Sequence, residues 1–378
     1  MVSRSNLSVL HIGPAKYRPY DRGHVTYGIW RELALGFGNY HVIARSMDGP
    51  AVWSDGALRV TLITSRADRE AEFLLTQFRA VPLAVHARPD VIVCQSPVLG
   101  GLAAILIARL TGARTLFELH GMEVFVPVRF GSRLWLLQQL SRFALKRADL
   151  IRVLSPRMGE ELARIYGANL ESRTRILPPR VDVSKFTQKI RSRGPDDALR
   201  LAMVGTVTEN KGQLRLIRAL SSIYFPVELH IVGEGPDLAA VRRAADALTD
   251  GASNLRVVLH GPLPHAAVAD VLHNCDVFVF YSAMEAAGRA MMEAMAVGLP
   301  VIVTNAGFCV EFVDDGCEGF VLGDDPDSEV VPALEKLDRD PELAQRMGEA
   351  GRRRAERDYD AVALFQRYKA LIAETAAA

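Results

Sequence analysis

The feature that most constrains the fold of this chain is its alternation of short apolar segments with longer amphipathic ones. Continuous apolar runs, such as those in RPDVIVCQSP at 88–97 and DVFVFYS at 276–282, are typical of strands buried on both faces. The segments between such runs have the spacing of helices with one apolar side. Strands that alternate with helices form a parallel sheet covered on both faces, so the sequence predicts an α/β protein.

The alternation occurs twice along the 378 residues. A first series ends near residue 182, a polar stretch follows at 188–199, and the alternation restarts at 200–205. The sequence therefore predicts two Rossmann-like, doubly wound domains, 1–187 and 188–359. Ligands bind at the carboxyl ends of parallel strands, so two such domains that face each other would place their ligand loops in a central cleft.

Composition excludes several classes of protein. A formal net charge of +1 gives no reason to expect nucleic acid as a partner. The four cysteines lack zinc or disulfide spacing, and Cys94 and Cys275 lie in apolar runs, so we expect core thiols and a reducing cytoplasm. The N-terminus does not have the pattern of a signal peptide, and no window of about 18 apolar residues predicts a membrane-spanning helix.

The segment SAMEAAGRAMMEAMAVGLPV at 282–301 carries the clearest chemical pattern. If a helix begins at Gly288, the backbone amides of Gly288, Arg289 and Ala290 have no intrahelical acceptor, and together with the helix dipole they form a site for phosphate. Glu285 precedes this site and Glu293 follows it in the second turn. Each carboxylate can accept two hydroxyl hydrogens, which suits a nucleotide sugar.

The segment 284–322 resembles the signature region of the retaining glycosyltransferases of family 4, which have the GT-B fold. The family pattern is roughly E-G-F-G-x-x-x-x-E-A-M-A-x-G-x-P-V, followed by Gly-Gly-x-x-E-x-x-x-x-G-x-x-G. VGTVTENKG at 204–212 and LHIVGEGP at 229–236 resemble two further motifs, and the likeness extends over nearly the whole chain. The matching residues are Glu285, Gly288, Glu293, Ala294, Met295, Ala296, Gly298, Pro300, Val301, Gly307, Glu311, Gly316 and Gly319.

The resemblance implies a role for each of four residues. Glu293 would hold the ribose of the donor and Glu285 the transferred sugar. Lys211 would neutralise the diphosphate as it leaves, and His120 in FELHG would stand close to the reacting centre. The resemblance also implies that the C-terminal helix, about 360–378, packs back on the N-terminal domain, which would bind the acceptor while the other domain binds the donor.

Departures from the family pattern qualify these roles. Thr206 follows Gly205 where the family usually has arginine, and Arg289 is the candidate to supply the missing charge, against the alternative of a surface arginine. We expect the donor site to comprise Gly205, Thr206, Lys211, Gly288, Arg289, Ala290 and Glu293. The N-terminal loop lacks a Gly-Gly pair, and its candidate acceptor contacts are Tyr17, Arg18 and Tyr20, against the alternative of a flexible polar loop.

No Asp-x-Asp motif stands after a strand, and the acidic pairs at 195–197 and 324–326 are typical of turns. A helix N-terminus and basic side chains can neutralise a diphosphate without a metal, so we expect no essential metal and no other cofactor. The stretch 129–152 mixes basic and apolar residues. It is either a domain helix with snorkelling arginines or a peripheral contact with an anionic membrane at its inner face.

These observations predict a retaining glycosyltransferase that moves a sugar from a UDP- or GDP-sugar to an acceptor hydroxyl. The acceptor would be a glycan, a lipid-linked molecule or a small molecule, in glycan, polysaccharide or glycoconjugate biosynthesis. Two alternatives stay open: a sugar-nucleotide epimerase on the same fold, and a non-catalytic nucleotide-binding or membrane-docking relative. Neither the donor base, the linkage nor the oligomeric state follows from the sequence.

Overall fold

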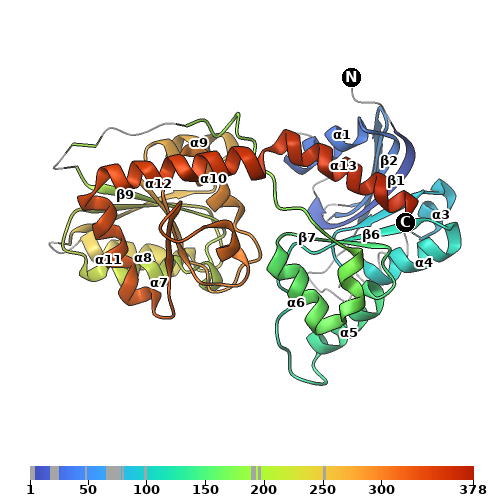
Figure 1. Cartoon of the computed structure of the whole chain (residues 1–378), viewed down its shortest axis with the longest axis horizontal. Helices are drawn as coiled ribbons and strands as arrows, with labels where there is room; N and C mark the ends of the chain where they lie inside the picture. Colours follow the sequence, from blue (N-terminus) through green and yellow to red (C-terminus); the bar gives the residue numbers. More distant parts are fainter. Residues whose placement is uncertain are drawn as a thin grey trace. The chain divides into compact units, whose positions relative to one another are not determined.

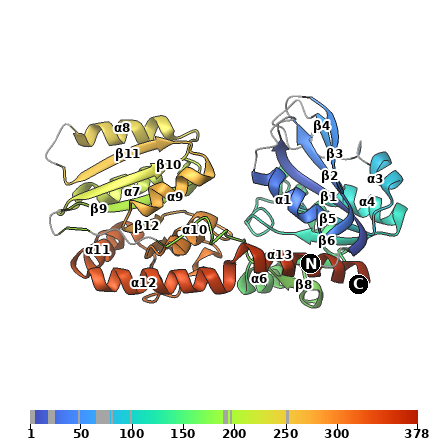
Figure 2. The ribbon, with the colours of Figure 1, turned by 90° about the horizontal axis from the view of Figure 1, so that it is seen from above.

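The computed structural model describes residues 5–17, 25–46, 49–64, 78, 81–97, 100–188, 193–194, 197–249 and 253–378. The chain forms two compact units, each with its own sheet. Unit 1 comprises Met1–Leu177 and Phe365–Ala378, and unit 2 comprises Pro178–Leu364. Figure 1 labels the helices and strands, and Figure 2 shows them from above.

Unit 1 contains an eight-stranded sheet in the part of the chain that is described, in the order β3-β4-β2-β1-β5-β6-β7-β8. All neighbouring strands are parallel except β3 and β4, which pair as an antiparallel hairpin at one edge. The strands are β1 (Ser5–Tyr17), β2 (Phe37–Ser46), β3 (Ala51–Asp55), β4 (Leu58–Thr64), β5 (Val91–Cys94), β6 (Arg114–Glu118), β7 (Leu150–Val153) and β8 (Thr174–Ile176).

Helices cover both faces of this sheet. In Figure 1, α1 and α13 lie on one face, and α4 and α5 lie on the other. The helices are α1 (Val25–Ala34), α3 (Val81–Ala87), α4 (Gly101–Thr111), α5 (Arg133–Leu145), α6 (Pro156–Tyr166) and α13 (Ala361–Ala377), with a short 3₁₀ helix η1 (Ala168–Arg173). Ser132 and Ser155 cap α5 and α6 by accepting hydrogen bonds from Trp135 N and Met158 N, which explains where these helices begin.

Unit 2 contains a six-stranded parallel sheet in its described residues, in the order β11-β10-β9-β12-β13-β14. Because β9 lies between β10 and β12, the strand order reverses beside it, and ligands of doubly wound sheets bind at such a point. The strands are β9 (Leu199–Val204), β10 (Val227–Val232), β11 (Leu255–Gly261), β12 (Val277–Phe280), β13 (Val301–Thr304) and β14 (Gly319–Leu322).

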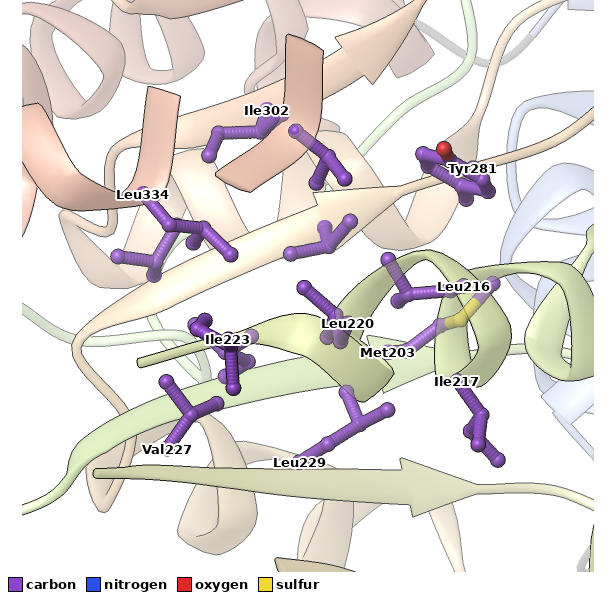
Figure 3. Packing of buried hydrophobic residues seen from close by; sticks show 14 of the residues in the cluster. Met203, Leu216, Ile217, Leu220, Ile223, Val227, Leu229, Tyr281, Ile302 and Leu334 are labelled. Atoms are coloured by element: carbon purple, nitrogen blue, oxygen red, sulfur yellow. The ribbon is translucent and has the colours of Figure 1, made fainter. Parts of the chain in front are cut away.

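The helices of unit 2 also divide between two faces: α7, α8 and α11 lie on one side of the sheet, and α9, α10 and α12 on the other (Figure 1). Figure 3 shows the core under α7, where Leu216, Leu220 and Leu229 are fully buried between helix and sheet. The elements are η2 (Glu209–Lys211), α7 (Gln213–Ala219), η3 (Leu220–Ser222), α8 (Leu238–Thr249), α9 (His265–His273), α10 (Arg289–Val297), η4 (Cys309–Phe312), α11 (Pro326–Arg339), α12 (Pro341–Arg354) and the π-helix η5 (Ala355–Tyr359).

The predicted fold class is confirmed: each unit is an α/β layer structure built on a parallel, Rossmann-like sheet. Cys94 and Cys275 are buried, as expected of core thiols. The sequence did not predict β3 and β14, since β3 alternates half-buried and exposed residues at a sheet edge and β14 is only four residues long.

The division between the units lies at 177/178, ten residues before the expected boundary at 187/188. The reason is packing within unit 2. Val181 forms a β-bridge with Asp360, and Phe186 is buried with its ring 5.2 Å from that of His265. The C-terminal segment grouped with unit 1 begins at Phe365, where the sequence suggested about 360.

Candidate functional site

The N-terminus of α10 is the centre of the predicted site. Gly288 is its N-cap, in the left-handed conformation with φ 58° and ψ 61°, and no side chain caps the helix. A Cβ at Gly288 would stand 3.0 Å from the Phe280 ring, so the turn has both a conformational and a steric reason to use glycine. The arrangement leaves the amide donors of the first turn, at Arg289 and Ala290, without a capping side chain, which favours an anion.

Lys211 and Glu285 come together beside this helix end. Lys211 Nζ forms an ion pair with Glu285 Oε2 and lies 5.4 Å from the centroid of the Phe280 ring. Both side chains are about a quarter exposed, so each is partly open to solvent while the ion pair fixes its position. Phe280, the last residue of β12, therefore lies beside both Gly288 and Lys211.

Glu293 lies on the buried side of α10 and is only 5% exposed. Its Oε1 is 2.9 Å from Nε2 of His265, the first residue of α9, and 3.5 Å from Nε of Arg289. Both basic groups meet the same oxygen. A carboxylate has a second oxygen that can accept further hydrogen bonds, and neither of these two contacts uses Oε2 of Glu293.

Gly205 and Thr206 form the loop after β9, packed against the loop after β10. A Cβ on Gly233 would stand 2.0 Å from Gly205 O, and one on Gly235 would stand 2.2 Å from Val207 O. The Thr206 side chain is exposed, and its carbonyl accepts a hydrogen bond from Gln213 Nε2 at 3.1 Å. This close backbone packing brings Lys211, in η2, to the edge of the sheet at which α10 begins.

The loop after β13 fixes the backbone of Glu285. Phe308 N donates a hydrogen bond to Glu285 O at 2.9 Å, and Gly307 has φ 63° where a Cβ would meet that same oxygen at 2.3 Å. Cys309, two residues after Gly307, has a buried thiol, and burial raises the pKa of this thiol to about 12. Burial thus favours the protonated thiol, which is the less nucleophilic form of cysteine.

His120 lies in the other unit, two residues after β6. Its side chain is 42% exposed, and its Nε2 is 3.2 Å from Oε2 of the buried Glu118. Among the proposed acceptor contacts, Tyr17 is the last residue of β1, and Arg18 and Tyr20 lie outside the described residues. The structure thus gathers the predicted donor residues in unit 2 and places His120 in unit 1.

The stretch 129–152 folds into α5 and its flanks. It exposes large apolar side chains at Phe130, Leu134, Leu136 and Phe143. Arg147 stacks on Phe143 at 3.6 Å, whereas Arg152 is turned inward onto Glu118. The basic residues of this stretch therefore do not all belong to one surface.

The described residues show neither a metal-binding cluster nor a membrane-spanning helix. Within the described residues, no cluster of three or more His, Cys, Asp or Glu side chains has an arrangement that could hold a metal ion. Over the same residues, none of the helices combines the length and apolarity needed to cross a membrane.

Two residues that contact the predicted site residues were not identified from the sequence. His265 contacts Glu293, and Glu118 contacts His120. His265 carries no local motif, because its partner is 28 residues away in sequence. Glu118 did carry a signal, since it is a carboxylate only two residues before His120 in the sequence.

We predict that Gly307→Ala destabilises the protein more than Gly316→Ala does. Both glycines have a left-handed φ, so alanine costs about 1 kcal/mol at either position. A Cβ at Gly316 meets open space, whereas one at Gly307 meets Glu285 O, which adds roughly 1–3 kcal/mol of overpacking. Urea unfolding followed by circular dichroism measures the difference, and equal midpoints for the two variants would contradict it.

Two family profiles match the chain. Residues 184–354 match the family described as glycosyl transferases group 1, and residues 23–180 match the family described as glycosyl transferase 4-like domain. The first match covers β9 to α12 and includes the whole candidate site of unit 2, and the second covers most of unit 1 including His120.

Curated relatives agree with these families. One relative is the GDP-mannose-dependent alpha-(1-6)-phosphatidylinositol monomannoside mannosyltransferase of Mycolicibacterium smegmatis. The chain is 33% identical to it over 270 residues, and this alignment covers 65% of this chain and 66% of the relative. The first three relatives are matched over 71%, 56% and 66% of their own lengths.

Solved structures show the same fold. The sucrose-phosphate synthase of Thermosynechococcus elongatus has a TM-score of 0.78 at 20% identity and covers 98% of this chain and 99% of its own. HepE of Anabaena, solved with UDP-glucose, has a TM-score of 0.74 at 17% identity and covers 98% and 99%. With matching profiles for both units and this shared architecture, the chain belongs to the family-4 type of glycosyltransferases with the GT-B fold.

Proposed function

We propose that the protein is a retaining glycosyltransferase that uses a UDP- or GDP-sugar and acts in the synthesis of a glycan or glycoconjugate. The observation that carries the proposal is the uncapped N-terminus of α10, with Glu285 and Lys211 before it and the buried Glu293 after it. Relatives support both donor classes, since one is named for GDP-mannose and HepE was solved with UDP-glucose.

In this proposal the donor binds along unit 2. The β-phosphate accepts hydrogen bonds from the first amides of α10, and the ribose hydroxyls donate to the Glu293 oxygen that His265 leaves open. Arg289 contributes positive charge at the helix start, where Thr206 supplies none. Glu285 accepts hydrogen bonds from hydroxyls of the transferred sugar.

The reaction forms a bond between the acceptor oxygen and the anomeric carbon, on the face from which the nucleoside diphosphate leaves. The bond to the β-phosphate oxygen breaks, and that oxygen takes the acceptor proton, so no protein base is required. Lys211 stabilises the negative charge that develops on the leaving group. When no donor is bound, Glu285 neutralises Lys211, and the incoming diphosphate competes for the same ammonium group.

A donor panel tests the proposal. The protein is incubated with UDP- and GDP-sugars, each with glycan, lipid-linked and small-molecule acceptors, with and without EDTA. We expect transfer from one donor, thermal stabilisation by the matching nucleoside diphosphate, and unchanged activity in EDTA. Proton NMR of the product gives the anomeric configuration, which should equal that of the donor.

Each other outcome removes a defined part of the proposal. Inversion at the anomeric carbon removes the retaining mechanism, and loss of activity in EDTA removes the metal-free mechanism. A donor converted to its epimer without an acceptor indicates an epimerase. Stabilisation by a nucleotide without any turnover indicates a binding protein.

We predict that Lys211→Ala lowers kcat by about 10²- to 10³-fold, because the transition state loses the ammonium group that stabilises the negative charge on the leaving diphosphate. Arg289→Ala should instead weaken binding of the nucleoside diphosphate about tenfold, as expected for a charge-assisted contact. Initial rates and calorimetric titration measure these effects.

The matched control for both variants is Lys185→Ala. Lys185 also pairs with a carboxylate of unit 2, that of Asp182, but it is exposed and lies outside the candidate site. It should leave rates and affinity within about twofold of the wild type. If Lys211→Ala behaves like this control, Lys211 does not stabilise the leaving group, and unchanged affinity in Arg289→Ala removes Arg289 from the donor site.

We also propose that the α5 region makes a peripheral contact with an anionic membrane on the cytoplasmic side. Its exposed Leu136 and Phe143 lie two turns apart on one face of α5, with Arg147 stacked on Phe143, and would enter the interface together. Sedimentation with phosphatidylglycerol vesicles should deplete the protein from solution, and Leu136→Glu with Phe143→Glu should abolish this. No depletion at low salt would contradict the proposal.

A further inference from the structure

Unit 1 contains a buried carboxylate that the proposed mechanism does not use. Glu118 is the last residue of β6 and is 1% exposed. Burial of an unpaired carboxylate costs several kcal/mol, so such a group is retained only with partners that satisfy its charge. Its partners and its place two residues before His120 indicate what it does.

Among the described residues, two side chains are seen to bond to Glu118, and a third packs on one of them. Arg152, on the neighbouring strand β7, donates from Nη1 to Glu118 Oε1 at 2.9 Å. The Arg152 guanidinium in turn lies 5.2 Å from the centroid of the ring of Tyr368, on α13. His120 Nε2 lies 3.2 Å from the other carboxylate oxygen, Oε2.

These contacts determine the ionisation of Glu118. Burial by itself would raise the pKa of Glu118, but the Arg152 guanidinium and the hydrogen bond with His120 hold that pKa well below its usual range. An ionised carboxylate can only accept hydrogen bonds. The hydrogen between Glu118 and His120 therefore resides on Nε2 of the imidazole.

We infer that Glu118 is a positioning residue: it accepts the Nε2 hydrogen of His120 and so leaves Nδ1 as the imidazole nitrogen that meets the reactants. The inference rests on the proposed function for the role of His120. Arg152 in turn holds Glu118, and the ring of Tyr368, on the C-terminal helix α13, packs against the Arg152 guanidinium. A carboxylate that fixes the tautomer and orientation of a histidine has this effect in other enzymes.

The test is Glu118→Gln, which preserves size but can also donate a hydrogen bond, so that it no longer selects one tautomer. The matched control is Asp149→Asn. Asp149 is a partly buried carboxylate between the same two strands, and it accepts from Thr115 N at 2.8 Å and from Arg114 Nη1 at 2.9 Å. Those partners begin β6, so this control lies at the end of the strand remote from His120.

Two readouts separate positioning from stability. Nitrogen-15 NMR at alkaline pH, with the His120 signal assigned by its loss in His120→Asn, should show the Nε2–H tautomer in the wild type and in Asp149→Asn. Glu118→Gln should show a mixture of tautomers. In the donor assay, Glu118→Gln should lower kcat about 10- to 100-fold with the KM for the donor changed less than about threefold.

The outcomes are distinguishable. If Glu118→Gln retains the wild-type kcat, or if it retains the single tautomer, the inference is wrong while the transferase assignment stands. If the wild type transfers no sugar, the proposed function fails, and the tautomer measurement alone decides whether Glu118 positions His120. Should circular dichroism show that Glu118→Gln is unfolded, Glu118→Gln with Arg152→Met replaces it, because removing both buried charges together is tolerated better than removing one.

Discussion

The candidate site depends on one constraint, the helix that begins at a left-handed glycine with no capping side chain. Gly288 ends the turn after β12 in a conformation that residues with a Cβ adopt only at a cost, and α10 starts with amides that lack acceptors from a cap. The positions of Glu285, before Gly288, and Glu293, in the helix after it, follow from their sequence spacing from this glycine. The ring of Phe280 packs close to Gly288, and the ammonium group of Lys211 lies over the same ring.

The same kind of ion pair occurs in both units: each carboxylate discussed above has a basic partner. Glu285 pairs with Lys211, Glu293 with His265 and Arg289, and Glu118 with Arg152. For Glu118, burial by itself would raise the pKa, but the Arg152 guanidinium and the hydrogen bond with His120 hold that pKa well below its usual range. An ionised carboxylate is a hydrogen-bond acceptor, which is the property that a histidine N–H requires.

Much of this organisation could be predicted from the sequence, because it is local. The apolar runs predicted the parallel sheets, and Gly288, with Glu285 before it and Glu293 after it, predicted where α10 begins. What could not be predicted depends on contacts between distant segments. His265 reaches Glu293 across 28 residues, Arg152 reaches Glu118 across 34, and the short edge strands depend on neighbours rather than on their own pattern.

The most direct measurement is a crystal structure of the protein soaked with UDP or with GDP. The account predicts that the β-phosphate lies against the amides of Gly288, Arg289 and Ala290, with the ribose hydroxyls on Glu293. A nucleotide bound elsewhere, with the first turn of α10 empty and Glu293 contacting no pentose, would contradict it.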